Sequence, residues 1–192
     1  SGHPALFSIC LTNEPSYTDS GPISERGFHT WLTDKHGSVE RLNTIYESSY
    51  ETIDQVPLPT RQSAVDSDPP RPLWYDWCRY NQDRVYDHHR WMRDVIRSID
   101  PDLPTHVKIQ GRVFDGIYAY PMGINPEKMC RLDRVSGSDN WSYYRPGVHR
   151  EYAQHWIRQA MFYDLQRSFA PESPIFNSEN HPIEDANPMW VS

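Results

Sequence analysis

The chain has 192 residues, a formal net charge of −7 and a pI near 5.7, and this length can bury one large core without splitting into domains. The acidic balance, with no Lys/Arg-rich run, argues against nucleic acid as a partner, because neutralising phosphates needs a basic surface. No stretch of about eighteen apolar residues occurs, so we expect no membrane span and no membrane partner. Cys10, Cys78 and Cys130 are too few and too widely spaced for a disulfide framework or a metal motif.

The first half of the chain predicts one buried strand and three helices. Residues 5–11 (ALFSICL) form a continuous apolar run, which is short enough for a strand of a parallel sheet. Gly37 can end a first helix that starts near residue 24, and Ser38 can cap a second one. Residues 57–72 are rich in Pro, Ser and Asp and predict a loop. Residues 73–99 repeat apolar side chains every three or four positions and predict a long helix that closes at Asp100-Pro101.

The second half alternates predicted strands and helices. Strands are expected at residues 105–109, 134–138 and 174–178, and helices at 127–132 and 148–169. Regular alternation of strands and helices is typical of an α/β fold in which crossover helices connect the strands of a parallel sheet. We therefore predict this class for the chain as a whole.

Two glutamates each follow an apolar run that is expected to end a strand. Glu14 lies in the phrase NEP after the first run, and Glu179 lies in the phrase SENH after the last. Barrel enzymes keep their catalytic groups at this end of their strands. Taken alone, a glutamate after a strand is more often an ordinary loop or N-cap carboxylate.

Together, the two glutamates suggest the chemistry of a glycosidase. A retaining glycosidase uses two carboxyl groups about 5–5.5 Å apart, one as acid/base and one as nucleophile. In a parallel barrel, strands three apart face each other across the mouth, so Glu14 and Glu179 could meet there. The long stretches at residues 15–72 and 111–148 would build a deep pocket at the strand exits, which favours catalysis over a bare scaffold.

The residues around Glu14 resemble clan A glycoside hydrolases, and most closely the family 42 β-galactosidases. Members of that family run from an Asn-Glu dipeptide into a helix with a Trp-Leu pair, then into a Tyr/His-Gly-Ser/Thr turn and a Leu-Asn segment. The matching residues here are LTNEPSY, Trp31-Leu32, His36-Gly37-Ser38 and Leu42-Asn43. Residues 76–101 resemble the next family helix, which ends at an Asp-Pro.

The resemblance implies that residues 1–192 form part of a (β/α)8 TIM barrel, from about strand 4 to strand 7. Glu14 would be the general acid/base, Glu179 the nucleophile, and Asn13 would bind the sugar 2-hydroxyl. The remainder of the barrel would come from the same or another polypeptide, because half a barrel leaves two open sheet edges. The expected partners are thus a carbohydrate substrate and the rest of the barrel, and whether the chain forms a homo-oligomer stays open.

Further residues predicted to contact substrate follow the last two strands. Asp139, Trp141 and Tyr143 lie where clan relatives place sugar contacts, and an indole there could stack on a pyranose. A packed lid loop is the alternative. Asn180 and His181 lie beside Glu179 and are expected to contact the substrate. His181 could instead hydrogen-bond Glu179, or only the backbone.

Other chemistries lack their motifs. Gln110 and Arg112 follow the second predicted strand and could reach a hydroxyl or remain solvated. His88 and His89 are adjacent on a helix and point apart, and no histidine spacing resembles a catalytic zinc site, so we expect neither metal nor cofactor. Nucleophile-elbow, phosphate-loop and dinucleotide motifs are absent from the sequence.

These patterns lead to one expected function with two alternatives. The expected function is a retaining, β-galactosidase-like glycosidase that works by double displacement with Glu14 and Glu179. One alternative is a non-catalytic carbohydrate-binding barrel whose carboxylates only bind hydroxyls. The other is the same chemistry on another β-linked sugar, such as a mannoside or an algal polysaccharide.

Overall fold

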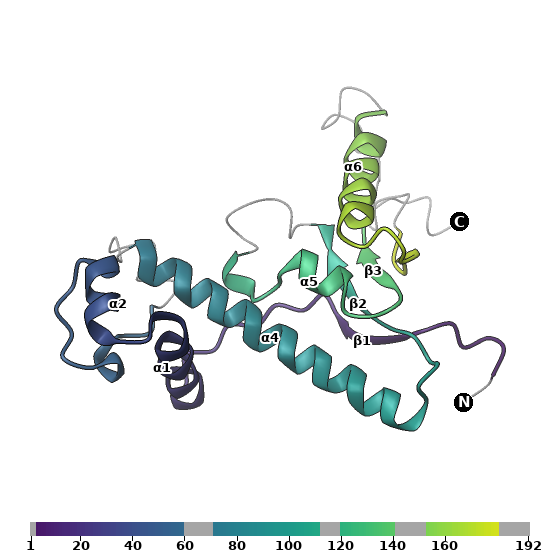
Figure 1. The fold of residues 1–192 in the computed structure, drawn as a ribbon. Coiled ribbons are helices and arrows are strands. Elements are labelled where there is room, and N and C mark those ends of the chain that lie inside the picture. Colours follow the sequence, from purple (N-terminus) through teal and green to yellow (C-terminus); the bar gives the residue numbers. More distant parts are fainter. Residues whose placement is uncertain (1–2, 60–70, 112–119, 141–152, 181–192) are drawn as a thin grey trace. The chain divides into compact units, whose positions relative to one another are not determined.

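The computed structural model describes residues 3–59, 71–111, 120–140 and 153–180 of the chain (Figure 1). These residues divide into two compact units. The sheet unit comprises Ser1–Pro15, Tyr86–Ala119 and Ile124–Ser192, and the helical unit comprises Ser16–Val85 and Tyr120–Gly123.

The sheet unit contains four strands and the helices that connect them. The strands are β1 (Ile9–Asn13), β2 (Thr105–Gln110), β3 (Ser136–Asp139) and β4 (Ile175–Asn177). Helices α5 (Pro126–Cys130) and α6 (Ala153–Phe169) belong to the same unit, as does the second part of the long helix α4 (Arg71–Ile99).

All four strands are parallel, and they lie side by side in chain order, β1-β2-β3-β4. An order that never reverses is the arrangement of barrel strands, whereas an open doubly wound sheet has a point at which the order switches. Because the strands are parallel, their carboxyl ends all reach the same edge of the sheet. Any side chains that follow the strands are therefore gathered at one edge.

The two faces of β2 have different surroundings. Val107 and Ile109 are almost fully buried and share one face of the strand, and α5 contacts β2. The opposite face carries His106, Lys108 and Gln110, which are polar yet buried or half-buried. We call this second face the inner face of the sheet. Alternation of apolar and polar residues along a strand thus assigns one face to the core and the other to chemistry.

The helical unit is built around an aromatic core. Its helices are α1 (Pro22–His36), α2 (Val39–Tyr46) and the first part of α4, together with the short turns η1 (Ile53–Gln55) and η3 (Tyr120–Met122). Phe28 is fully buried, and its ring meets Trp77 edge-on with 5.6 Å between centroids. Burying one such side chain contributes about 1.5–3 kcal/mol. The core as a whole comprises Phe28, Leu32, Leu42, Tyr46, Val56, Leu73, Trp77, Cys78 and Tyr80.

The structure confirms the predicted order of strands and helices and adjusts their ends. Gly37 ends α1 with a φ of 77°, and Ser38 caps α2 by accepting a hydrogen bond from the Arg41 amide at 3.3 Å, as expected. The first strand, however, runs from Ile9 to Asn13 and not over residues 5–11. Pairing with β2 begins only where Ile9 lies opposite Thr105, so the apolar run located the strand but not its ends. Among the described residues, no helix is both long and apolar enough to cross a membrane.

Candidate active site

Three acidic side chains meet at the carboxyl edge of the sheet. Glu14 directly follows β1, Asp139 ends β3, and Glu179 follows β4 by two residues. One carboxylate oxygen from each lies within 4.8 Å of the other two. The sheet therefore brings together residues that are far apart in the sequence, and the convergence of Glu14 and Glu179 is the geometry that the sequence led us to expect.

The backbone of Glu14 departs from strand geometry. Its φ is +46°, in the left-handed region that non-glycine residues seldom occupy, and its amide donates to the Lys108 carbonyl at 3.0 Å. This residue directly follows the last residue of β1. The Glu14 carboxylate accepts a hydrogen bond from the side-chain amide of Gln110 on the inner face of β2. Strain of this kind costs roughly 1–3 kcal/mol and persists where surrounding contacts hold it.

Glu179 is paired with a buried cation. The ammonium of Lys108 contacts a Glu179 carboxylate oxygen, and the Lys108 side chain is only 6% exposed, whereas that of Glu179 is 40% exposed. Lys108 and Gln110 are two residues apart on β2, so they point to the same face. One strand therefore supplies a cationic partner to one glutamate and a neutral amide partner to the other.

Asp139 ends β3, a strand that otherwise consists of small residues. A Cβ atom added to Gly137 would lie 2.5 Å from the His106 ring and 2.5 Å from the Val107 carbonyl oxygen, so only glycine fits there. Asp139 is two residues further along, on the same face as Gly137, and is buried. Burial also lowers the pKa of His106, which favours its neutral form at the base of this inner face.

A layer of amides fixes the backbone next to Glu179. The Asn177 side-chain oxygen accepts hydrogen bonds from the amides of Asn140 and Glu179, both at 3.3 Å. Its NH2 group donates to the Asn140 carbonyl at 2.6 Å. Gln159 on α6 donates both to that carbonyl and to the Asn180 side chain. The strand end that presents Glu179 is thus tied to α6.

Of the other predicted site residues, the structure describes Asn13 and Asn180. Asn13 is exposed at the end of β1. Asn180 is exposed, and its side chain accepts the hydrogen bond from Gln159 at 3.1 Å. Trp141, Tyr143 and His181 lie outside the described residues, as does Arg112.

Sequence reasoning missed Lys108 and Asn177. The sequence did contain a signal for Lys108, which lies in the middle of the strand THVKIQ. If a lysine in such a strand is buried, it must find a counter-charge or a hydrogen-bond acceptor.

Carboxylate oxygens are the ligands that hard cations such as Mg²⁺ and Ca²⁺ prefer. The trio of Glu14, Asp139 and Glu179 therefore has the donor set for such an ion, and the ammonium of Lys108 lies beside Glu179.

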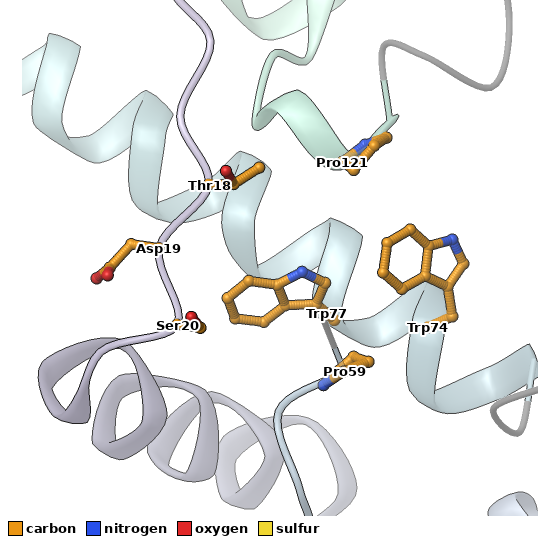
Figure 2. A pocket seen from close by; sticks show the side chains of 7 residues that line it. All are labelled: Thr18, Asp19, Ser20, Pro59, Trp74, Trp77 and Pro121. Atoms are coloured by element: carbon orange, nitrogen blue, oxygen red, sulfur yellow. The ribbon is translucent and has the colours of Figure 1, made fainter. Parts of the chain in front are cut away.

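The helical unit has a pocket of its own, of about 120 Å³ (Figure 2). Two indoles from the start of α4 form much of its wall, while the Asp19 carboxylate accepts hydrogen bonds from the Gly21 amide at 2.9 Å and from the Ser24 hydroxyl. The hydrogen bond from Ser24, then that from Gly21, lowers the pKa of Asp19. The lining residues are Thr18, Asp19, Ser20, Pro59, Trp74, Trp77 and Pro121.

Comparison with known proteins places this chain in a family. The family model for β-galactosidases of glycoside hydrolase family 42 matches residues 1–190. β-Galactosidase Bga of Halorubrum lacusprofundi is 30% identical over 125 residues, covering 62% of this chain and 16% of that protein. β-Galactosidase LacZ of Heyndrickxia coagulans is 23% identical over 215 residues, covering 86% of this chain and 31% of its own length.

Solved structures agree on the fold. The apo exo-carrageenase of family 42 from Bacteroides ovatus superposes with a TM-score of 0.76 and 26% identity, covering 92% of this chain and 26% of that one. The cold-adapted β-galactosidase from Rahnella sp. R3 superposes with a TM-score of 0.78 and 19% identity, covering 93% and 25%. The predicted fold, part of a (β/α)8 barrel, is confirmed, and the chain spans about a quarter of these structures. Because the family model matches nearly the whole sequence, the chain belongs to the family 42 β-galactosidases of the glycoside hydrolases.

Proposed function

We propose that the chain supplies both catalytic carboxylates of a retaining β-glycosidase of family 42, with Glu179 as nucleophile and Glu14 as acid/base. The observation that carries this proposal is the approach of the two side chains, with a carboxylate oxygen of each within 4.8 Å. Retaining enzymes hold their carboxyl groups about 5–5.5 Å apart, whereas inverting enzymes need roughly 6.5–9.5 Å to admit a water molecule. An oxygen-to-oxygen separation within 4.8 Å lies below the inverting range, which supports the retaining class.

The surroundings of the two glutamates support this division of roles. A carboxylate beside a lysine ammonium is favoured in its charged form, and Glu179 is the one that contacts Lys108. Glu14 contacts the neutral amide of Gln110, and like charges nearby disfavour its ionisation. The proton that the acid must donate is therefore assigned to Glu14, and the negative charge that the nucleophile needs is assigned to Glu179.

The reaction then proceeds in two displacements. A Glu179 oxygen bonds to the anomeric carbon while the glycosidic C–O bond breaks and Glu14 transfers its proton to the leaving oxygen. In the second step Glu14 takes a proton from water, the water oxygen bonds to the anomeric carbon, and the Glu179 carboxylate is released. Asn13, Asp139, Trp141, Tyr143, Asn180 and His181 are proposed to contact the sugar.

The sugar is proposed to be a β-galactoside, because relatives named β-galactosidases match most of the chain. An algal polysaccharide is the second candidate, because a relative of 26% identity is a family 42 exo-carrageenase. Both candidates use the same pair of carboxylates. The remainder of the barrel, which these relatives have and this chain does not span, would complete the substrate contacts.

The proposal is tested by trapping the glycosyl-enzyme in the complete enzyme. An aryl 2-deoxy-2-fluoro-β-galactoside with a dinitrophenolate leaving group is incubated with the enzyme, which is then digested and mapped by mass spectrometry. We expect one fluorosugar on the peptide that contains Glu179. Loss of activity without a covalent adduct, or an adduct on another residue, would refute the nucleophile assignment, and binding without turnover would identify a non-catalytic sugar-binding barrel.

A matched pair of variants completes the test. Glu179→Gln should lower kcat/KM for an activated aryl β-galactoside by several orders of magnitude, because no nucleophile remains. Glu172→Gln removes an exposed carboxylate that precedes β4, and it should leave the rate unchanged. Near-normal hydrolysis by Glu179→Gln would overturn the assignment.

A further inference from the structure

We infer that Lys108 is a positioning residue of this site, whose ammonium keeps the Glu179 carboxylate charged and oriented while the proton of the site resides on Glu14. This inference rests on the proposed function and adds to it a residue on a strand that carries neither glutamate. Three features of the site support it: the burial of Lys108, the charge balance among the carboxylates, and the different partners of the two glutamates.

Lys108 is buried although it carries a charge. Removing an ammonium from water costs several kcal/mol unless a charge and hydrogen-bond acceptors compensate for it, and the Lys108 side chain is 6% exposed. Its ion-pair partner is Glu179, which is itself 40% exposed at the edge of the sheet. A lysine that only stabilised the interior would pair with a buried acid. Lys108 instead reaches from the interior toward a carboxylate that an external molecule can meet.

The carboxylates at the sheet edge outnumber the cation on β2. Glu14 from β1, Asp139 from β3 and Glu179 after β4 place three carboxylates within 4.8 Å of one another. Three negative charges at such distances repel, so at least one group is expected to hold a proton. Burial lowers the pKa of His106, the other titratable group on this face of β2, and so favours its neutral form. Lys108 is the cation on this strand, and Glu179 is the carboxylate that it contacts.

The two glutamates have different partners on β2. Lys108 and Gln110 extend from the same face of one strand, and each contacts a different glutamate. A cation stabilises only the charged form of a carboxylate, whereas an amide NH2 donor bonds to either form of a carboxyl oxygen. The strand thus provides different electrostatic environments for two chemically identical side chains. Such a separation is what acid/base and nucleophile roles require.

The test measures how inactivation of the complete enzyme by the fluorogalactoside depends on pH. In this step a Glu179 oxygen bonds to the anomeric carbon and dinitrophenolate departs with the electron pair, so no proton from Glu14 is needed. The wild-type rate should fall at low pH as Glu179 takes up a proton. In Lys108→Met the acidic limb should move to higher pH by about one to three units, because removing an adjacent cation raises a carboxyl pKa by that amount.

Two control variants separate charge from packing. Lys108→Arg keeps the charge and should keep the wild-type acidic limb even if the rate falls. Lys35→Met removes the lysine of another lysine–carboxylate pair, in the helical unit, and should leave the limb unchanged. If Lys108→Met does not fold, Lys108→Gln replaces it. If neither neutral variant folds, a limb displaced by a full pH unit in Lys108→Arg would overturn the inference.

The outcomes also distinguish this inference from the proposed function. A fluorosugar on Glu179 with the same acidic limb in wild type and Lys108→Met refutes the role of Lys108 alone. A fluorosugar on another residue refutes the proposed function itself. A lower melting temperature without a change in the pH profile would show that Lys108 only stabilises the fold, and this too would overturn the inference.

Discussion

Two lysine–carboxylate pairs, one in each unit, are built in opposite ways. In the helical unit the acid is buried and the cation is exposed: the Asp76 side chain is 3% exposed and that of Lys35 is 37% exposed. In the sheet unit the cation is buried and the acid is exposed: the Lys108 side chain is 6% exposed and that of Glu179 is 40% exposed. The pairs have the same chemistry, but each presents a different partner to the outside.

The hydrogen bonds around the two acids differ in the same way. Asp76 accepts from His36 Nε2 at 2.7 Å and from the Tyr46 hydroxyl at 2.8 Å, in addition to Lys35. Burial, then the neighbouring Asp76 charge, raises the pKa of Tyr46 well above its ordinary value, so this donor keeps its proton. Asp76 is surrounded by donors, which suits a structural acid. Glu179 instead lies among other carboxylates, an arrangement that costs stability and is typical of an active site.

The largest effect on stability is expected from Asp76→Asn. Asp76 is buried, so losing its charge weakens the hydrogen bonds from the buried His36 and Tyr46, and each hydrogen bond to a charged group contributes about 1.5–3 kcal/mol. Hydrogen–deuterium exchange of the complete enzyme, read on peptides from α1 and α2, should show faster exchange. Peptides from β2 and β3 should exchange as before.

Asp34→Asn is the matched control, because Asp34 is an exposed residue of the same helix α1. Its exchange rates should stay near those of the wild type. If Asp76→Asn changed the pH dependence of catalysis and left the helices protected, the contrast between the structural and the catalytic acid would be wrong.

Much of the fold could be predicted from the sequence because its signals are local. The cap at Ser38, the stop at Gly37 and the apolar period of α4 each involve residues a few positions apart. The position of Glu14 could also be predicted, because a polar residue after an apolar run is visible in the sequence. The contacts of Lys108 could not, because they depend on which strands become neighbours and which face of β2 turns inward. Side-chain alternation in β2 narrows the choice to two faces, but only the assembled sheet selects one.

An intermediate loss of stability is expected from Asp133→Asn. This variant tests whether a buried acid in the sheet unit can have a structural role alone. Asp133 accepts hydrogen bonds from the Thr105 amide at 2.9 Å and the Thr105 hydroxyl at 2.7 Å, and thereby holds the start of β2. Burial acts to raise its pKa, but the hydrogen bonds from Thr105 and Arg134 and the charge of Arg97 outweigh it, so the pKa is lowered. Losing charged hydrogen bonds of this kind costs about 1.5–3 kcal/mol.

The pH dependence of this effect has a definite sign. A carboxyl group whose pKa is lower in the folded state stabilises the fold above its unfolded value, near 3.8, and that stability is lost as the pH falls through the folded value. Exchange of β2 peptides should therefore accelerate below about pH 4 in the wild type, and less so in Asp133→Asn. Asp102→Asn, which changes a side chain that is 94% exposed, should follow the wild type. A wild-type acid response in Asp133→Asn would contradict this role.

The smallest effect concerns the backbone of Glu14 and separates strain from chemistry. Glu14→Gln and Glu14→Asn both remove the acid, so both should lose about 10²- to 10⁴-fold in hydrolysis of a galactoside with a poor leaving group. They differ at a φ of +46°, because asparagine occupies the left-handed region more readily than glutamine does. Glu14→Asn should therefore be more stable than Glu14→Gln by about 0.5–1 kcal/mol, measured as slower hydrogen–deuterium exchange in β1 peptides.

The matched control compares Glu47→Asn with Glu47→Gln, since Glu47 has a φ of 51° at the end of α2 and no catalytic role is assigned to it. If asparagine is favoured at position 47 but not at position 14, the contacts at the sheet edge set the conformation of Glu14 more strongly than its backbone preference does.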